Sequence, residues 1–233
     1  MIEIFSPVSK GLMQLAGVLS IGLLLSICFL DTDIKGAVNN SKLVKKAKSL
    51  ILVWLLTTSL FILVQISYLL EQPFLSSFDL TVIRSYLTQT SVGKSYLIQI
   101  IGLIIILSIP IKRILTTYFL LLISLIVIIA PVFQSHGSSS GNHGLAIGAL
   151  VVHVIAISFW VGGLFGLTQL DKTQKLIALP RFSEIALWSA ITVALTGAAT
   201  AWTRLDTIAS WQSKYGAITL FKIFLTITLI GFG

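Results

Sequence analysis

The stretch HGLAIGALVVHVIAISFWVGGLFGL, residues 143–167, decides the fold class. It contains no Asp, Glu, Lys or Arg, and about 20 predominantly apolar residues are enough for a helix to cross a bilayer. We therefore expect a membrane-spanning helix from His143 to Leu170. Two of the chain's three histidines, His143 and His153, fall inside it, and the third, His136, comes shortly before.

His153 stands in the middle of this apolar run. A histidine at bilayer depth is costly, so it is a functional hypothesis by default. The alternative is a neutral histidine that only links two helices by a hydrogen bond. Gly162 and Gly166 form a small-xxx-small step that lets another helix approach closely. At helical spacing one face is expected to carry His153, Ala156, Trp160 and Gly163.

Composition places the whole chain in the same class. Hydrophobic residues make up 56% and charged residues 10% of the sequence, and the mean hydropathy is +1.00. The net charge of +8 does not indicate nucleic acid, because the basic residues lie in short loops between apolar runs. The single cysteine, Cys28, excludes an intrachain disulfide and a CxxC motif.

Apolar runs recur along the chain, and they predict an all-α, polytopic membrane bundle with seven spans. A polar stretch over residues 71–91 separates the second and third spans and is expected to hold a short amphipathic turn around Phe78 to Leu87. Besides the span from His143, the expected spans cover residues 8–30, 49–70, 93–110, 114–133, 182–203 and 215–233.

The distribution of positive charge predicts the orientation. The three loops expected in the cytoplasm hold ten Lys or Arg residues and the external segments hold five. Because basic residues are retained in the cytoplasm, the N-terminus is expected outside. His136 and His143 then lie at the outer face, in a loop rich in Gly and Ser.

The chain also shows a weak internal repeat, with residues 1–133 as a first four-span unit and 134–233 as an incomplete second unit. Four spans per unit give both copies the same orientation. An eighth span is then expected beyond Gly233. Ionisable residues concentrate in the second unit, where His153 aligns with Gln14, Trp188 with Trp54, and Lys222 with Gln99.

From His153 onward the sequence resembles the copper-resistance CopD family of bacterial inner-membrane proteins. The similar segments are HVIAISFWVGGL at 153–164, RFSEIALWSAITVALTGAATAW at 181–202 and YGAITLFKIFL at 215–225. The loop SHGSSSGNHGLAIGALVVH is similar to that of fusions joining a CopD region to a CtaG-like cytochrome oxidase assembly region. The resemblance implies that copper ions cross, or are accepted at, the bacterial plasma membrane, and that a CtaG-like region follows Gly233.

Imidazole binds copper in both oxidation states, so the metal-ligand candidates are His136, His143 and His153. Copper, as Cu(I) or Cu(II), is expected as a transient ion, captured at the loop and passed to His153. The chain has only two methionines, which argues against a ladder of thioether ligands. Candidate path or supporting residues are Met13, Gln14, Trp160, Thr192, Thr196 and Lys222, and Met13 and Gln14 are the expected partners of His153.

Each of these residues has a simpler interpretation. The loop histidines are equally explained as solvated side chains, Lys222 as a lysine that reaches the membrane surface, and the threonines as groups that bond to their own helix. The rival function is a structural subunit for cytochrome c oxidase assembly that binds no metal. A bis-histidine haem site fits poorly, because only one histidine lies deep in a span.

No residue pattern indicates an enzyme, since paired intramembrane carboxylates, a nucleophile with its base and a phosphate loop are all missing from the sequence. The apolar spans and the family resemblance together give the expected partners. These are copper ions, the lipid bilayer and either an external copper chaperone or cytochrome c oxidase.

Overall fold

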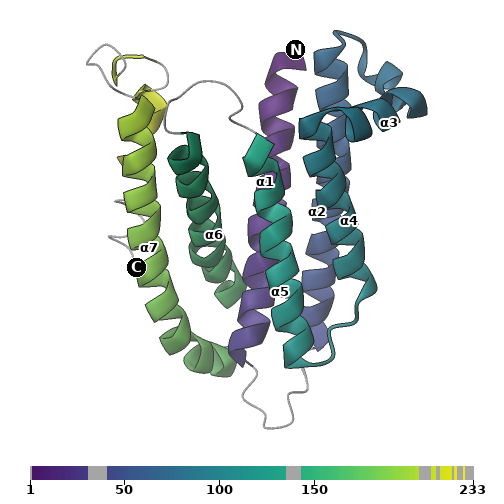
Figure 1. Ribbon diagram of the computed structural model, residues 1–233. Helices are drawn as coiled ribbons and strands as arrows, with labels where there is room; N and C mark the ends of the chain where they lie inside the picture. Colours follow the sequence, from purple (N-terminus) through teal and green to yellow (C-terminus); the bar gives the residue numbers. More distant parts are fainter. Residues whose placement is uncertain are drawn as a thin grey trace.

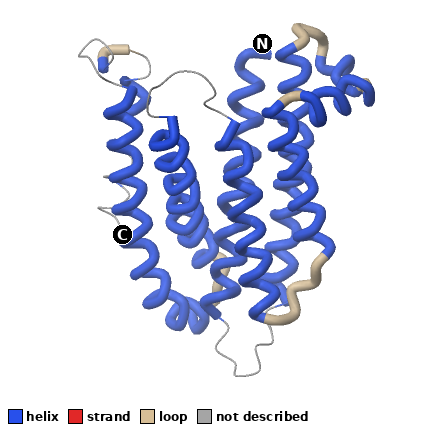
Figure 2. Tube along the Cα trace, in the orientation of Figure 1, coloured by secondary structure: helices blue, strands red, loops and turns tan. Residues whose placement is uncertain are grey.

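The computed structural model describes residues 2–30, 41–134, 143–204, 211–213, 216–221, 223, 224 and 228. This part of the chain is helical and contains no strand (Figures 1 and 2). Its elements, in chain order, are α1 (Ile2–Leu30), α2 (Ser41–Leu69), the 3-10 helix η1 (Phe74–Phe78), α3 (Leu80–Gln89), α4 (Ser91–Ser108), α5 (Ile114–Ile129), the 3-10 helix η2 (Ala130–Gln134), α6 (His143–Thr168) and α7 (Lys172–Arg204).

Six of the described helical segments are long and apolar enough to cross a membrane. This confirms the predicted all-α, multi-pass membrane bundle. The expected seventh span at 215–233 lies mostly outside the described residues, although 216–221 are helical. The six spans are Phe5–Phe29, Lys42–Leu69, Ser91–Ser108, Ile114–Phe133, Ile147–Thr168 and Lys172–Ala199.

Two helices begin well before the apolar runs that predicted them. In α2 the first turns are amphipathic, because Leu43 and Ala47 are buried while the lysines between them are exposed. In α7 the start is fixed by a reciprocal cap, since the Gln174 amide donates to Asp171 Oδ1 at 2.9 Å and the Asp171 amide donates to Gln174 Oε1 at 3.3 Å. Residues 172–181 are therefore helical, although a loop was expected there.

Successive spans alternate in direction, so the bundle has two distinct ends. At one end, here called the α3 end, α1 begins and the amphipathic helix α3 lies across the helix ends (Figure 1). The predicted amphipathic segment around 78–87 corresponds to α3. The opposite end, here called the basic end, holds nine of the described basic residues: Lys42, Lys45, Lys46, Lys48, Lys112, Arg113, Lys172, Lys175 and Arg181.

The first helix is the centre of the bundle. It packs against α2, α5, α6 and α7. In its most apolar stretch 72% of the residues are buried inside the protein, against 22–39% in the other five spans. Every other span therefore has a larger share of its surface left for lipid.

Glycines allow α1 and α6 to touch backbone to backbone. A Cβ atom on Gly22 would overlap the backbone of Gly162, and one on Gly162 would overlap the carbonyl oxygen of Val18. A Cβ on Gly166 would overlap the side chain of Ser26. The predicted close approach at Gly162 and Gly166 is thus confirmed, and the helix that approaches is α1.

Cations at the basic end hold the carboxyl ends of helices. Arg181 Nη1 donates to the carbonyl oxygen of Phe29 in the last turn of α1 at 2.7 Å. Such carbonyls have no partner within their own helix, and a cation also suits the negative end of the helix dipole. The end of α4 is held similarly by Lys48, whose ammonium donates to the carbonyl oxygens of Ile106, Leu107 and Ile109.

The substitution Gly22→Ala tests the backbone contact between α1 and α6. Its methyl group would overlap the Gly162 carbonyl, so we expect a loss of about 1–3 kcal/mol in the free energy of unfolding. The matched control is Gly148→Ala in α6, where a Cβ would meet nothing within 4 Å. Denaturation of the purified protein in mixed detergent measures both variants, and equal stability would contradict the proposed crossing.

Candidate functional site

His153 lies between α6 and α7. Ala156 and Trp160, on the same face of α6, pack with Ala190 and Val193 of α7. Further along, a Cβ on Gly163 would overlap the ring of Phe182. The predicted shared face of His153, Ala156, Trp160 and Gly163 is therefore the contact surface with α7.

Thr196 holds the ring of His153. The two groups join through His153 Nδ1 and Thr196 Oγ1, which are 2.9 Å apart. The Thr196 hydroxyl also donates to the carbonyl oxygen of Thr192 at 2.6 Å. We place the hydroxyl proton in that short bond, in which case Oγ1 would accept from Nδ1–H. A neutral ring protonated at Nδ1 carries its lone pair on Nε2, which is the form that binds a metal ion through Nε2.

The loop histidine His143 is separate from this ring. His143 is the first residue of α6, so ten residues place it about 15 Å along the helix from His153. His136 lies outside the described residues, as does the side chain of His143. The described residues contain no group of three or more His, Cys, Asp or Glu side chains that could hold a metal ion together.

Met13 and Gln14 do not meet His153. The α1 helix touches α6 at Gly162, which is nine residues, or about two and a half turns, from His153. His153 therefore faces away from α1 and toward α7. Met13 is buried in the main core and Gln14 is exposed.

The other three predicted path residues, Trp160, Thr192 and Lys222, differ in their position relative to His153. Trp160 is buried beside α7, two turns from His153. The hydroxyl of Thr192 donates to the Trp188 carbonyl at 2.7 Å and so bonds back to its own helix. Lys222 falls outside the described residues. Sequence reasoning named both His153 and Thr196 but did not pair them, because their contact depends on how α6 meets α7.

Residues 1–145 match the family model Copper resistance protein D-like, N-terminal domain, and residues 176–233 match Copper resistance protein D. The first match alone covers more than half of the chain. The chain belongs to the copper resistance protein D family.

Family membership makes this chain a copper-resistance membrane protein. The match over 1–145 extends the family to the first half, where the sequence had offered only hydropathy and a weak repeat. His153 falls in the segment between the two matched regions. No curated protein and no solved structure matches the chain.

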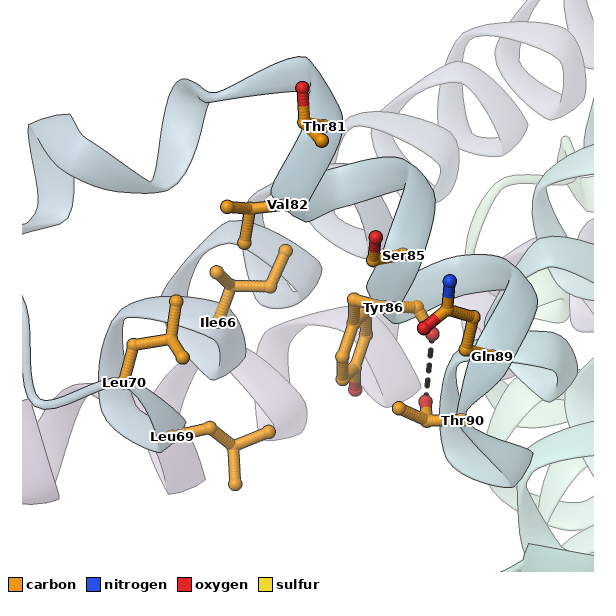
Figure 3. A pocket seen from close by; sticks show the side chains of 9 residues that line it. All are labelled: Ile66, Leu69, Leu70, Thr81, Val82, Ser85, Tyr86, Gln89 and Thr90. Carbon is orange, nitrogen blue, oxygen red and sulfur yellow. Dashed lines mark hydrogen bonds between the residues drawn. The ribbon is translucent and has the colours of Figure 1, made fainter.

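A cavity of about 350 Å³ lies elsewhere, at the α3 end (Figure 3). Ile66, Leu69 and Leu70 from the end of α2 form one wall, and α3 forms the other. Tyr86 is buried in the α3 wall, and burial raises the pKa of its hydroxyl to about 12. None of the predicted copper residues lines this cavity, so we do not assign the copper site to it.

Tyr86 makes the attachment of α3 dependent on pH. Its pKa is near 10 when unfolded and about 12 when folded, so its contribution to stability is complete below pH 10 and is lost as the pH rises toward 12. We expect the unfolding temperature to fall between these pH values, and to fall less in Tyr86→Phe. Thermal unfolding at pH 9 and pH 11 measures this, and identical pH profiles would contradict it.

Nitrogen-15 NMR of labelled histidine tests the geometry at His153. The neutral ring should be protonated at Nδ1 in the wild type and in Thr196→Ser, which keeps the hydroxyl. In Thr196→Val this preference should weaken because the acceptor is removed. His153→Ala assigns the resonance, since the chain has only three histidines. A wild-type ring protonated at Nε2 would contradict the proposed hydrogen-bond pattern.

Proposed function

We propose that this protein accepts copper ions at the α3 end of the bundle and passes them into the membrane through His153. The observation that carries the proposal is the pairing of His153, in the span Ile147–Thr168, with Thr196, in the span Lys172–Ala199. That pairing orients the imidazole and directs the lone pair of the neutral ring to Nε2. Oriented imidazole is a good copper ligand, and hydrogen-bonded partners of this kind tune metal affinity.

The weakness of such a site suits an ion in transit. Conduction requires binding that is strong enough for entry and weak enough for release. An imidazole supported by the hydroxyl of Thr196 meets this requirement better than a closed set of charged ligands would. Copper is then the cargo of the protein and is not permanently bound.

The charge distribution supports the direction from which copper arrives. Because basic residues tend to be retained in the cytoplasm, the basic end would lie inside, and the α3 end and His143 outside. His136 and His143 are then the first ligands, at the surface of a bacterial plasma membrane. An external copper chaperone is the partner that would deliver the ion there.

Copper titration tests this proposal directly. Purified wild type should bind Cu(I) or Cu(II), His153→Ala should lose the inner site, and the double variant His136→Ala/His143→Ala should lose the outer site. Thr196→Val should weaken the inner site by about 10- to 100-fold, whereas Thr196→Ser should retain it. The matched control is Gly197→Ala, whose methyl group would lie 4.0 Å from His153 Cε1 in ordinary contact and should leave binding unchanged.

The outcome that rejects the proposal is binding by wild type no greater than by the triple histidine variant. Function that survives loss of all three histidines would instead favour a subunit that assists assembly of cytochrome c oxidase without binding metal.

A further inference from the structure

Three buried side chains lie at one level inside the group formed by α1, α2, α4 and α5. Gly17 of α1 meets Trp54 of α2, where a Cβ would lie 2.8 Å from the indole. The two helices are antiparallel. Met13, four residues before Gly17 on α1, therefore lies opposite Thr58, four residues after Trp54 on α2. The Ser6 hydroxyl, which donates to Gln65 Oε1 at 3.1 Å, confirms the same register.

The level extends to α4. The rings of Phe61 on α2 and Tyr96 on α4 pack with their centroids 5.1 Å apart. These helices are also antiparallel, so Thr58, three residues before Phe61, lies opposite Gln99, three residues after Tyr96. The relative exposures of Met13, Thr58 and Gln99 are 2%, 0% and 1%. We call these three residues the Met13 layer.

The members of the layer face the same interior. On α4, Gln99 stands midway between Tyr96, which faces α2, and Gly102, which meets Val127 of α5. Its amide therefore points between α2 and α5. Met13 is one turn from Gly17, whose face meets α2 and α5, and so it points toward Gln99 from the opposite corner.

The Gln99 amide is the unusual member of the layer. Among the described residues, no hydrogen-bond partner reaches its Oε1 atom. Burying an amide oxygen away from water without a partner costs free energy, and within a membrane no bulk water relieves that cost. An oxygen in this position is suited to a partner that enters from outside the fold.

Buried polar side chains lead to the layer from the α3 end, although Ser20 and Ser124 are also buried on the side of the basic end. One turn nearer the α3 end are the buried Ser9 and Ser95, and beyond them lies the Ser6–Gln65 pair. On the other side, toward the basic end, large and fully buried side chains close the interior: Trp54, Leu103, Ile51, Ile106 and Leu120.

The layer lies at the same depth as His153. Helices α1 and α6 run in the same direction and touch at Gly22 and Gly162. Met13 precedes Gly22 by nine residues, and His153 precedes Gly162 by nine, which is about 14 Å in each helix. The two halves of the bundle thus place a copper-compatible side chain at one level.

We propose that the Met13 layer is a second copper station, selective for Cu(I), with Met13 Sδ as the principal ligand and the oxygens of Gln99 and Thr58 beside it. The proposal rests on the proposed function in taking copper as the cargo, but it does not depend on His153. A thioether is a soft ligand that selects Cu(I). The three ligands are neutral, and a monovalent ion costs far less than a divalent ion to bury among neutral groups.

Selenium X-ray absorption tests the station, because the chain has only two methionines, Met1 and Met13. Selenomethionine-labelled His153→Ala protein is loaded with Cu(I) under anaerobic conditions. We expect selenium–copper scattering, and we expect it to disappear in His153→Ala/Met13→Leu, which nearly conserves side-chain volume. Gln99→Leu should weaken Cu(I) binding without removing Met13.

The matched control moves the thioether by one residue. His153→Ala/Leu12→Met/Met13→Leu places it at position 12, where the native side chain is 49% exposed, and should show no selenium–copper scattering. Wild type that binds copper through histidine without this scattering, or scattering that persists in Met13→Leu, overturns the station and leaves the proposal for His153 intact. Absence of copper from both His153 and the Met13 layer overturns the proposed function and the second station together. Retention of histidine-bound copper by Met13→Leu protein shows that this variant is folded.

Discussion

Gly22 and Gly162 bring the backbones of α1 and α6 into direct contact, and the rest of the bundle depends on that contact. Inside a bilayer, helices gain little from hydrophobic burial against one another, so close van der Waals packing has to hold them together. The crossing joins the first group of helices to the α6–α7 pair. It also fixes their relative depth, which is why His153 and Met13 lie at one level. A side chain at position 22 or 162 would separate the helices and remove that relation.

The basic end depends on a different constraint. The last carbonyls of a helix have no partner within the helix, and hydrocarbon provides none. Lys48 and Arg181 supply the missing donors to α4 and α1 across long sequence separations. The residues that indicate orientation in the sequence thus also stabilise the fold. One set of charges serves both purposes because α1, α4 and α6 all have their carboxyl ends at that end of the bundle.

The sequence predicted what depends on the character of single segments. Apolar length predicted the described spans, helical spacing placed His153 and Trp160 on one face, and Gly162 with Gly166 predicted a close neighbour. It was less successful where structure depends on contacts between segments. The early start of α7 was overlooked because hydropathy masked the cap formed by Asp171 and Gln174. Met13 was proposed as a partner of His153 because the spans align, but alignment gives depth and not the direction in which a side chain points.

That distinction explains why Met13 and His153 belong to different interiors at equal depth. The contact between α1 and α6 occupies only one side of each helix, which leaves the opposite side free to face other helices. Met13 lies on the opposite side of α1 from that contact, toward α2 and α5, and His153 lies on the opposite side of α6 from it, toward α7. The crossing that aligns the two side chains in depth therefore also keeps them apart. A copper ion at one of them would be held by the ligands of its own helix group, so the two groups form separate candidate routes from the α3 end.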